Sequence, residues 1–541
     1  MSRSPLLRSL RQLVRDVRNS KKTGIPVDEI QGVRAERSAE RRREGLTRRG
    51  VLTGAIAGAG LLAIPRRARA AGQPAITIVG GGIAGLTCAL TLADAGYAST
   101  VYEASGRIGG RMFTNRTNYF GGQITEWGGE LIDTGHKTVR KLATRYGLPL
   151  DNLLNAQPNG SRDTSRFDNQ YYAATQADAD FLAMADALYA DLEAAGYPTT
   201  FDAYTAQGQS LDQMSIHQWI ASRVPGGNTS KLGQLLSTAY NIEFGAEASN
   251  QSALNLIYLL GFQPTSSQMD IYGESDEKFH IRGGNQQLPE AIADDLGDAV
   301  VKTGHALVRL AETPNGRYRA TFTRAGTSID VVSDYVVLAI PFAILKNIDT
   351  TQANFDARKK RAINQLGGGH NGKLQLQFDQ RNWLGQGPWP GKANGSSYSD
   401  AGYQVSWEAT RKQAGTAGIL VLYSGGNNTD SMKSTVPFAT AADAKVLQDA
   451  QKGFGQITQT FPGLAWNGKA TQSLMHKNPY ANLAYSFYKP GQYTDFGGYE
   501  AHKQGGVYFC GEHTTQEFQG FMEGGAITGK DTADKLIKKL A

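Results

Sequence analysis

A buried strand, a glycine-rich turn and a helix follow one another in the stretch ITIVGGGIAGLTCALTLADAGYASTVYEA, residues 76–104. The apolar run over 75–79 predicts a strand, and the small and apolar residues over 83–95 predict a helix that packs on it. The run VYEA, 101–104, predicts a second strand that ends in an acid. This order predicts the opening βαβ unit of a Rossmann-like domain.

Further along the chain, the hydrophobic period differs between two long segments. Apolar residues recur at a spacing of three to four over 177–196, and 253–262 is almost continuously apolar, so both stretches predict helices. The runs over 373–379 and 418–426 are strand-like and are separated by turns rich in Gly and Asn. We therefore expect a helical region before residue 280 and a region of strands after residue 346.

Three glycines of the first turn carry the earliest chemical signal. Gly80, Gly82 and Gly85 form G-x-G-x-x-G, which permits a tight turn, a close approach of the backbone to a pyrophosphate and close packing of the helix on the strand. Glu103 follows 23 residues after Gly80, where a carboxylate can accept both ribose hydroxyls. The alternative is a glycine turn with a purely structural role. The motif alone is a weak signal, and the acid favours a bound dinucleotide.

The loop that follows this acid favours FAD over NAD. Its sequence SGRIGGR, 105–111, places Arg107 and Arg111 beside three glycines. A pair of guanidinium groups suits a diphosphate, and the glycines let the backbone come close to it. The alternative is a loop with two solvent-exposed arginines.

Composition and charge exclude several other functions. With 541 residues and 40% hydrophobic content, the chain can bury a large core. Its formal charge of +7 is concentrated in residues 1–71, whose net charge of +11 leaves −4 for the remainder. No basic patch with interleaved aromatic residues follows, which argues against a nucleic-acid partner. Two cysteines and eight histidines without a cluster predict no disulfide framework and no metal site.

The N-terminal segment has the features of a targeting signal. Thr47, Arg48 and Arg49 precede a short run rich in Gly and Ala, and Ala68-Arg69-Ala70 offers a cleavage site between small residues. The segment resembles a twin-arginine export signal, preceded by a long basic stretch. The alternative is an uncleaved membrane anchor, for which the apolar run is short. We expect the export machinery to be a partner and the protein to be periplasmic or secreted.

From about residue 75 to the C-terminus, the chain resembles the flavin amine oxidase family, which contains monoamine, polyamine and L-amino acid oxidases. The resemblance rests on the opening glycine motif, on EWGGELID (126–133), on FHIRGGNQQLPEAIA (279–293) and on YFCGEHTTQEFQGFMEGGAITGKDTA (508–533). It implies bound FAD. The cofactor-binding residues it implies are Gly80, Gly82, Ala84, Gly85, Glu103, Ala104, Arg107, Gly110, Arg111, Gly128, Gly129, Glu130, Val308, Gly511, Glu512 and Met522.

These motifs lie far apart, so the FAD-binding domain is expected to be assembled from discontinuous segments. The predicted fold class is α/β, with a Rossmann-like FAD-binding domain and an α+β substrate-binding domain that has a helical subregion. The signal segment occupies 1–71. The FAD-binding domain takes 72–145, 280–345 and 490–541, and the substrate-binding domain takes 146–279 and 346–489.

Three residues match catalytic positions of the family. Lys373 matches the lysine that holds a water beside the flavin, while Tyr485 and Phe521 match two positions that form an aromatic cage in front of it. By pattern alone, Lys373 fits a solvated sheet face equally well, because K-L-Q-L-Q-F alternates, and each aromatic side chain fits an ordinary core. Ala484 stands where monoamine oxidases carry the cysteine that bonds the flavin, so FAD is expected to be non-covalent.

The substrate class is less clearly indicated. Tyr423 matches a tyrosine that helps to hold the substrate carboxylate in L-amino acid oxidases, or is an aromatic residue on a core strand. The arginine that those enzymes carry after the double glycine is absent, and His136 and Lys137 are the nearest cations in the sequence. A buried carboxylate without a cation is costly, so another residue would have to supply the charge.

The leading hypothesis is an FAD-dependent oxidase that converts an L-amino acid to a 2-oxo acid, ammonia and hydrogen peroxide, with molecular oxygen as acceptor. The alternatives are a monoamine or polyamine oxidase, a dehydrogenase with a periplasmic electron acceptor, a lipid desaturase or isomerase of the same architecture, and a flavin-binding protein without turnover. The sequence leaves the oligomeric state open and allows a homodimer.

Overall fold

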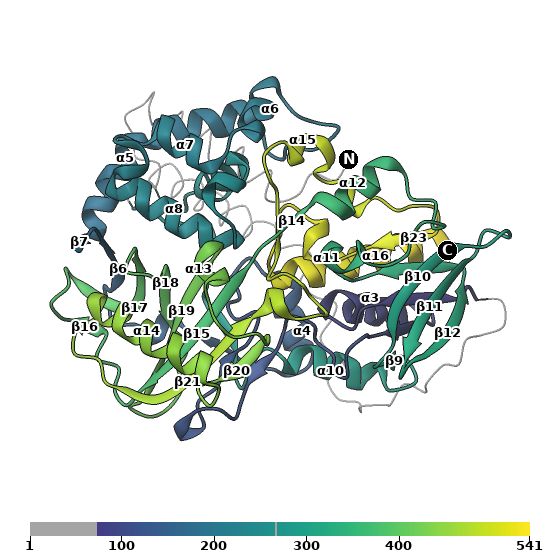
Figure 1. Ribbon diagram of the computed structural model, residues 1–541. Helices are drawn as coiled ribbons and strands as arrows, with labels where there is room; N and C mark the ends of the chain where they lie inside the picture. The colour runs from purple at the N-terminus through teal and green to yellow at the C-terminus, as the bar shows by residue number, and fades with distance from the viewer. Residues whose placement is uncertain (1–72, 266–267) are drawn as a thin grey trace, which may run out of the picture.

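A five-stranded parallel sheet forms the centre of one domain in the computed structural model, which describes residues 73–265 and 268–541 (Figure 1). Its strand order is β23-β13-β1-β2-β9. The strands are β1 (Ile76–Val79), β2 (Thr100–Tyr102), β9 (Val301–Lys302), β13 (Tyr335–Leu338) and β23 (Val507–Phe509). They come from three distant parts of the chain, which confirms the prediction of an α/β domain assembled from discontinuous segments. The predicted export signal lies outside the described residues.

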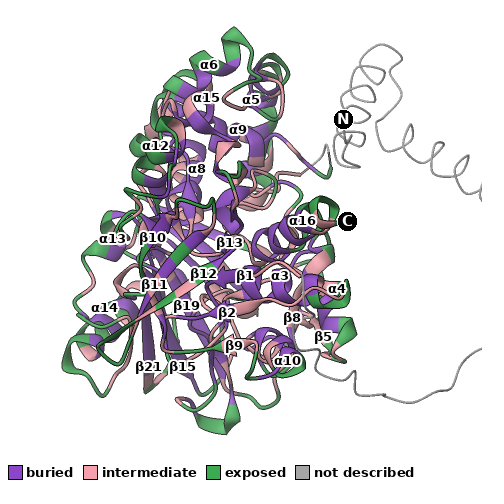
Figure 2. Ribbon diagram, turned by 90° about the vertical axis from the view of Figure 1, so that its right-hand side faces the viewer, coloured by how far each residue is buried: buried purple, intermediate pink, exposed green. Residues whose placement is uncertain are grey.

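Helices α3 (Ile83–Asp94), α4 (Lys137–Arg145) and α16 (Met522–Leu540) lie side by side, with α10 (Gln287–Leu296) against α3 (Figure 2). Gly529 on α16 allows the closest approach, because a Cβ there would lie 2.1 Å from the carbonyl oxygen of Ala84. A three-stranded antiparallel sheet completes this domain: β10 (Ala306–Glu312), β11 (Tyr318–Arg324) and β12 (Thr327–Ser333). Helix α16 therefore packs closely on α3.

A nine-stranded sheet forms the second domain. Its order is β20-β21-β15-β19-β18-β17-β6-β7, with β16 paired to β17. The predicted strands over 373–379 and 418–426 are confirmed as its central pair, β15 (Asn371–Phe378) and β19 (Gly418–Gly425), in antiparallel register. The other strands are β6 (Arg162–Phe167), β7 (Gln170–Tyr172), β16 (Leu384–Gln386), β17 (Lys392–Ser399), β18 (Val405–Glu408), β20 (Phe438–Thr440) and β21 (Trp466–Leu474), and helix α14 (Ala444–Thr460) packs on β15 and β21.

A helical subregion lies beyond this sheet, at the upper left of Figure 1. It contains α5 (Ala174–Ala195), α6 (Ala206–Gln213), α7 (Ile216–Arg223), α8 (Lys231–Phe244) and α9 (Ala253–Leu260). Both helices expected from the sequence are present, as α5 and α9. The expectation of a helical segment missed β6 and β7, which join the far end of the nine-stranded sheet. The run RDTSRF of β6 is polar at most positions, so its strand character arises from pairing with β17 rather than from a hydrophobic period.

Short elements complete the described fold: β3 (Thr114–Asn115), β4 (Thr125–Glu126), β5 (Leu150–Asn152), β8 (Phe279–Ile281), β14 (Gly367–Gly368), β22 (Ser486–Phe487), α11 (Phe342–Leu345), α12 (Ala357–Gln365), α13 (Asn427–Asp430) and α15 (Gln492–Phe496). Within the described ranges, no helix has the length and apolar character that crossing a membrane requires.

Candidate active site

A cavity of about 1020 Å³ runs between the two domains. Its walls come from the glycine turn, from the segment 103–131, from the nine-stranded sheet, from the end of α8 and from the start of α16. Seventeen of the twenty predicted site residues line it, including all four predicted catalytic residues. The three that do not are Gly85, Ala104 and Val308. The volume is at the upper end for a ligand site, so it suits a large cofactor with a small substrate.

The glycine turn leaves one end of this cavity open to a ligand. A Cβ at Gly85 would lie 2.0 Å from the carbonyl oxygen of Gly80, so Gly85 serves the contact between helix and strand rather than the cavity wall. A Cβ at Gly82 would meet nothing closer than 3.9 Å, and no side chain caps the N-terminus of α3 there. The first N–H groups of α3 therefore remain available to an anionic group.

Glu103 and the two arginines are tied into the same end. The Glu103 carboxylate accepts hydrogen bonds from the N–H of Gly81 at 2.7 Å and from the N–H and hydroxyl of Ser105 at 2.8 and 2.7 Å. Arg107 donates to the carbonyls of Ile108 and Gly110. Both arginines line the cavity, so the alternative of a loop pointing into bulk solvent is wrong, and the chain itself fixes their orientation.

Val308 does not reach the cavity. It lies on β10 at a register shift, its side chain is 42% exposed, and its carbonyl accepts a hydrogen bond from the N–H of Asp349. Ala104 follows Glu103 without lining the cavity. The sequence pattern did not indicate the register shift beside Val308.

The closing C-terminal motif also lines the cavity. The Nη1 of Arg111 donates to the Glu512 carboxylate and to the carbonyl of Ala484, both at 2.9 Å. Glu512 also accepts from the hydroxyl of Ser486 and from the N–H of Gly520. Burial raises the pKa of Glu512, but Arg111 more than offsets this, so its pKa lies below the ordinary value. A fixed negative charge thus faces the cavity at the start of α16.

Lys373 lies on the polar face of β15, and that face is buried. Its Nζ donates to Glu130 Oε2 at 2.7 Å and to the carbonyl of Gly128 at 2.8 Å, and the next residue on the same face, Gln375, donates to the carbonyl of Glu126. Lys373 is 7% exposed. The alternation K-L-Q-L-Q-F therefore marks a strand face docked on the other domain, and the solvated-face alternative is wrong.

Glu130 is the counter-charge of Lys373, a role that the sequence did not indicate. The carboxylate also accepts a hydrogen bond from Trp407 Nε1 at 2.8 Å. Burial acts to raise the pKa of Glu130, whereas the Lys373 ammonium and the Trp407 N–H lower it, and the resulting pKa is below its usual value. The Glu130 carboxylate is thereby held ionised in a buried wall of the cavity.

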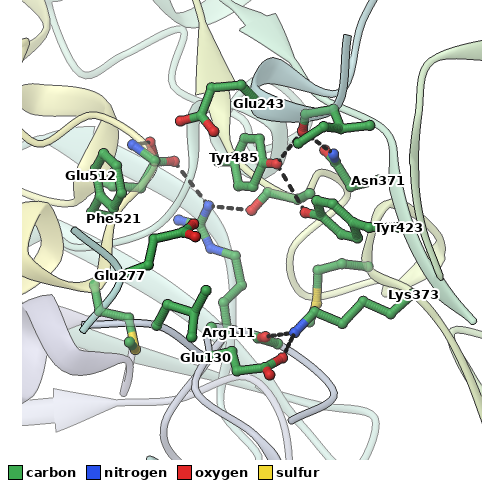
Figure 3. A pocket seen from close by; sticks show the side chains of 18 of the residues that line it. Arg111, Glu130, Glu243, Glu277, Asn371, Lys373, Tyr423, Tyr485, Glu512 and Phe521 are labelled. Carbon is green, nitrogen blue, oxygen red and sulfur yellow. Dashed lines mark hydrogen bonds and ion pairs between the residues drawn. The ribbon is translucent and has the colours of Figure 1, made fainter. Parts of the chain in front are cut away.

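Two tyrosines form a hydrogen-bonded chain beside this pair (Figure 3). Tyr423, opposite Lys373 in the β15–β19 register, contacts the Tyr485 hydroxyl at 2.9 Å, and Tyr485 donates to the carbonyl of Ile242 at 2.6 Å. Burial raises the pKa of both phenols, so they are neutral donors. Phe521, the residue before α16, lines the same space and packs edge-on against His136 at 5.1 Å.

Several charged residues of the cavity were not anticipated. Glu243 at the end of α8, Glu277 in the following loop and Asp163 on β6 bring carboxylates into it, and Arg411 brings a guanidinium. Glu243 is the one with a sequence signal, as the acid in an otherwise apolar helix end, YNIEFG. The others lie on segments whose placement only the tertiary structure defines.

One group of possible metal ligands occurs in the described residues, although the sequence predicted no metal site. His370, Asp430 and His476 bring one ligand atom each within 4.8 Å of one another. His370 Nδ1 lies 2.8 Å from Asp430 Oδ1, and the two imidazole rings stack at 4.4 Å. A hydrogen bond and ring stacking account for this arrangement without an ion.

A family model described as flavin containing amine oxidoreductase matches residues 83–537. The chain belongs to this family. It is 24% identical over 453 residues to an L-amino-acid oxidase of Pseudechis australis, covering 81% of this chain and 82% of the relative. It is 21% identical over 527 residues to a pseudooxynicotine dehydrogenase of a Pseudomonas species, covering 92% and 97%. Cyclohexylamine oxidase from Brevibacterium oxydans IH-35A has the same fold, with a TM-score of 0.72 at 20% identity over 86% of this chain and 99% of that one.

The cavity of this amine oxidoreductase fits a flavin dinucleotide. The N-termini of α3 and α16 lack side-chain caps and lie next to each other, because a Cβ at Gly525 would lie 2.8 Å from Ile83 Cγ2. A Cβ at Gly129 would meet the Met522 side chain at 2.9 Å. His513 lines the cavity with both ring nitrogens buried and without a partner among the described residues, and burial lowers its pKa to about 4. A neutral imidazole in that state is a donor and an acceptor in need of a ligand.

Proposed function

We propose that this flavin amine oxidoreductase is an FAD-dependent oxidase of L-amino acids. The observation that carries the proposal is Arg411. Its side chain lines the cavity that holds Lys373 and the tyrosine pair, and the residue is 7% exposed. Only its Nε donates a hydrogen bond to a described residue, the carbonyl of Glu408. Its terminal nitrogens form no hydrogen bond or ion pair with described residues, so they are free to bind a carboxylate bidentately.

FAD, when bound, supplies the two-electron acceptor for removal of a hydride equivalent from the carbon that bears the amine. The residues of this chain orient the reactants. Arg411 and the Tyr423 hydroxyl would hold the substrate carboxylate, while Tyr485 and Phe521 bound the space in which the neutral amine is positioned. The Lys373–Glu130 pair supplies a buried, hydrogen-bonded wall that would hold water beside the reacting carbon.

The overall reaction consumes an L-amino acid, molecular oxygen and water. It yields a 2-oxo acid, ammonia and hydrogen peroxide, because the imine formed by oxidation is hydrolysed. A second candidate is a dehydrogenase with another electron acceptor. It is favoured by the likeness to the pseudooxynicotine dehydrogenase, which extends over 92% of this chain.

Peroxide release and oxygen uptake, measured against L-amino acids paired with their decarboxylated amines, test the proposal. We expect turnover of the acids, with leucine preferred to isoamylamine. Arg411→Met should lower kcat/KM for the acids by roughly 100-fold, the loss of a charged hydrogen-bonded contact of about 3 kcal/mol, and leave the amines unchanged. The matched control is Arg319→Met on β11, whose side chain is 54% exposed outside the cavity.

Two outcomes would contradict the proposal. Turnover of amines alone would remove the role of Arg411, and flavin reduction without oxygen uptake would favour the dehydrogenase.

We also infer that FAD is bound non-covalently. Ala484 lines the cavity, and neither Cys88 nor Cys510 does. Acid precipitation should therefore release the flavin into the supernatant.

The twin-arginine motif further supports export of the folded protein. Replacing Arg48 and Arg49 by lysines should retain the flavin-loaded enzyme inside the cell, whereas an unchanged distribution would exclude this route.

A further inference from the structure

Carboxylates outnumber cations in the part of the cavity remote from the glycine turn. Apart from the paired Glu130 and Lys373, five acids line this part: Asp163, Glu243, Asp270, Asp276 and Glu277. Two guanidinium groups, Arg162 and Arg411, line it as well. Arg162 is already engaged by Asp178 at 3.0 Å, a residue outside the cavity. Acidic side chains therefore outnumber the cations available to them where the substrate would lie.

Glu243 faces the aromatic pair at the end of a helix. It follows Ile242, whose carbonyl accepts the hydrogen bond of Tyr485, and Figure 3 shows its carboxylate near the Tyr485 ring. It accepts no hydrogen bond from a described residue. The last turn of α8 also lacks a basic residue, although the negative end of the helix dipole favours a cation there. The pKa of Glu243 is raised well above the ordinary value, first by burial and then by Glu277 and Asp133.

Glu277 approaches from the loop that precedes β8. It has a left-handed backbone, with φ 44°, and its side chain accepts no hydrogen bond from the described residues. Burial and the nearby Asp133 raise its pKa to about 8. Glu243 and Glu277 both raise the pKa of Tyr423 and of Tyr485, after the larger effect of burial, so the charges of the two acids act on the two tyrosines.

Arg411 provides an independent sign of a ligand in the same space. It is a buried cation with free terminal nitrogens, yet it forms no ion pair with any of these acids although its charge lowers the pKa of Glu277. A ligand that satisfies all three side chains needs one anionic group for Arg411 and one cationic group for the acids. A cationic group would ionise both carboxyl groups and pair with them, whereas a neutral or acidic side chain would leave them without a charged partner.

We propose that the substrate is a dibasic L-amino acid, whose side-chain cation binds between Glu243 and Glu277 while its carboxylate binds Arg411. This inference rests on the proposed function, since it assumes that the α-amine is the group oxidised. The chemistry it requires is a primary amine with a second protonated nitrogen. A diamine shares that feature and differs only in lacking the carboxylate.

Four substrates of nearly equal shape differ in whether they carry a carboxylate and a second amine: L-lysine, L-norleucine, cadaverine and pentylamine. Peroxide release by the flavin-loaded enzyme should give a kcat/KM for L-lysine at least 100-fold above that for L-norleucine. L-norleucine equal to or better than L-lysine would overturn this inference and leave the L-amino acid oxidase intact. A higher kcat/KM for the amines than for both amino acids would overturn the proposed function. If kcat/KM for cadaverine were then far above that for pentylamine, Glu243 and Glu277 would be assigned to binding a diamine.

Variants of the two acids test whether they recognise the side-chain cation of the substrate. Glu243→Gln and Glu277→Gln keep the shape of each side chain and should each lower kcat/KM for L-lysine by at least tenfold, while L-norleucine changes less than twofold. Glu274→Gln, an exposed acid on the same loop outside the cavity, is the matched control. Equal losses for both substrates would show a structural role instead. Glu277→Asp should recover part of the L-lysine preference, and flavin content checks that each variant is folded.

Discussion

The two walls of the cavity differ in how they treat buried charge. On the wall formed by the FAD-binding domain and β15, Lys373 and Glu130 are joined at 2.7 Å and each has a further partner. On the wall formed by α8 and the loop before β8, Glu243 and Glu277 accept no hydrogen bond from the described residues, and no dashed line reaches either of them in Figure 3. The first wall is complete in the protein alone. The second wall becomes complete only with a ligand.

This difference separates two uses of charge. A paired charge is preorganised, so it fixes geometry before substrate arrives, and removing one partner leaves the other buried without compensation. An unpaired acidic side chain lowers the free energy of unfolding. It pairs only when a ligand of opposite charge binds, so it makes binding selective for such ligands. Substitutions on the two walls should therefore change stability in opposite directions.

The largest effect is expected for Lys373→Met. It leaves Glu130 buried without its cation, so the free energy of unfolding should fall by about 3–5 kcal/mol, and flavin reduction should slow by roughly 100-fold or more. Urea unfolding and anaerobic stopped-flow absorbance measure the two. Adding Glu130→Gln should restore most of the stability and none of the rate. A stable, fully active Lys373→Met enzyme would mean that the paired wall has no role in catalysis.

A smaller effect of opposite sign is expected for Glu277→Gln. The folded carboxyl keeps its proton up to a pKa of about 8, whereas the unfolded one loses it near 4.5, so wild-type stability falls as pH rises between these values. The charged groups around Glu277 that shape this titration are Asp133, Asp163, Glu130, Glu243 and Arg411. The variant should have a higher Tm than the wild type at pH 8 and the same Tm at pH 4. A lower Tm at pH 8 would mean that Glu277 has a stabilising partner.

The smallest effect is expected for Tyr423→Phe. It removes one hydrogen bond of a chain that Tyr485 still anchors on Ile242, so the free energy of unfolding should fall by about 0.5–1.5 kcal/mol. The KM for an L-amino acid should rise several-fold with kcat little changed. Tyr485→Phe removes both bonds and is the comparison variant. A larger loss of unfolding free energy for Tyr423→Phe than for Tyr485→Phe would contradict the assignment of one hydrogen bond to Tyr423 and two to Tyr485.

The cofactor end of the cavity could be predicted from the sequence because its determinants are local. Gly80, Gly82 and Glu103 act within one βαβ unit, and Met522 opens a helix whose motif is contiguous. Lys373 was found through its family match, whereas the pattern K-L-Q-L-Q-F does not tell a solvated face from one docked on another domain.

The unpaired wall could not be predicted in the same way. Glu243 and Glu277 come from the end of one helix and from a loop 34 residues later, and Arg411 comes from beyond β18. No local period relates these positions, because their proximity arises from the docking of the helical subregion on the nine-stranded sheet. The register shift beside Val308 on β10 is equally a product of strand pairing.

The order of strands in the parallel sheet bears on when this enzyme can acquire its flavin. Strand β1 lies beside β13, and β13 lies beside β23, which starts at Val507. Helix α16, which packs on α3, follows β23 and ends at Leu540. The chain must therefore be synthesised through α16 before the nucleotide site can close, so cofactor loading follows the synthesis of both β23 and α16. Loss of the last twenty residues should yield a colourless protein, however well the rest of the sequence is preserved.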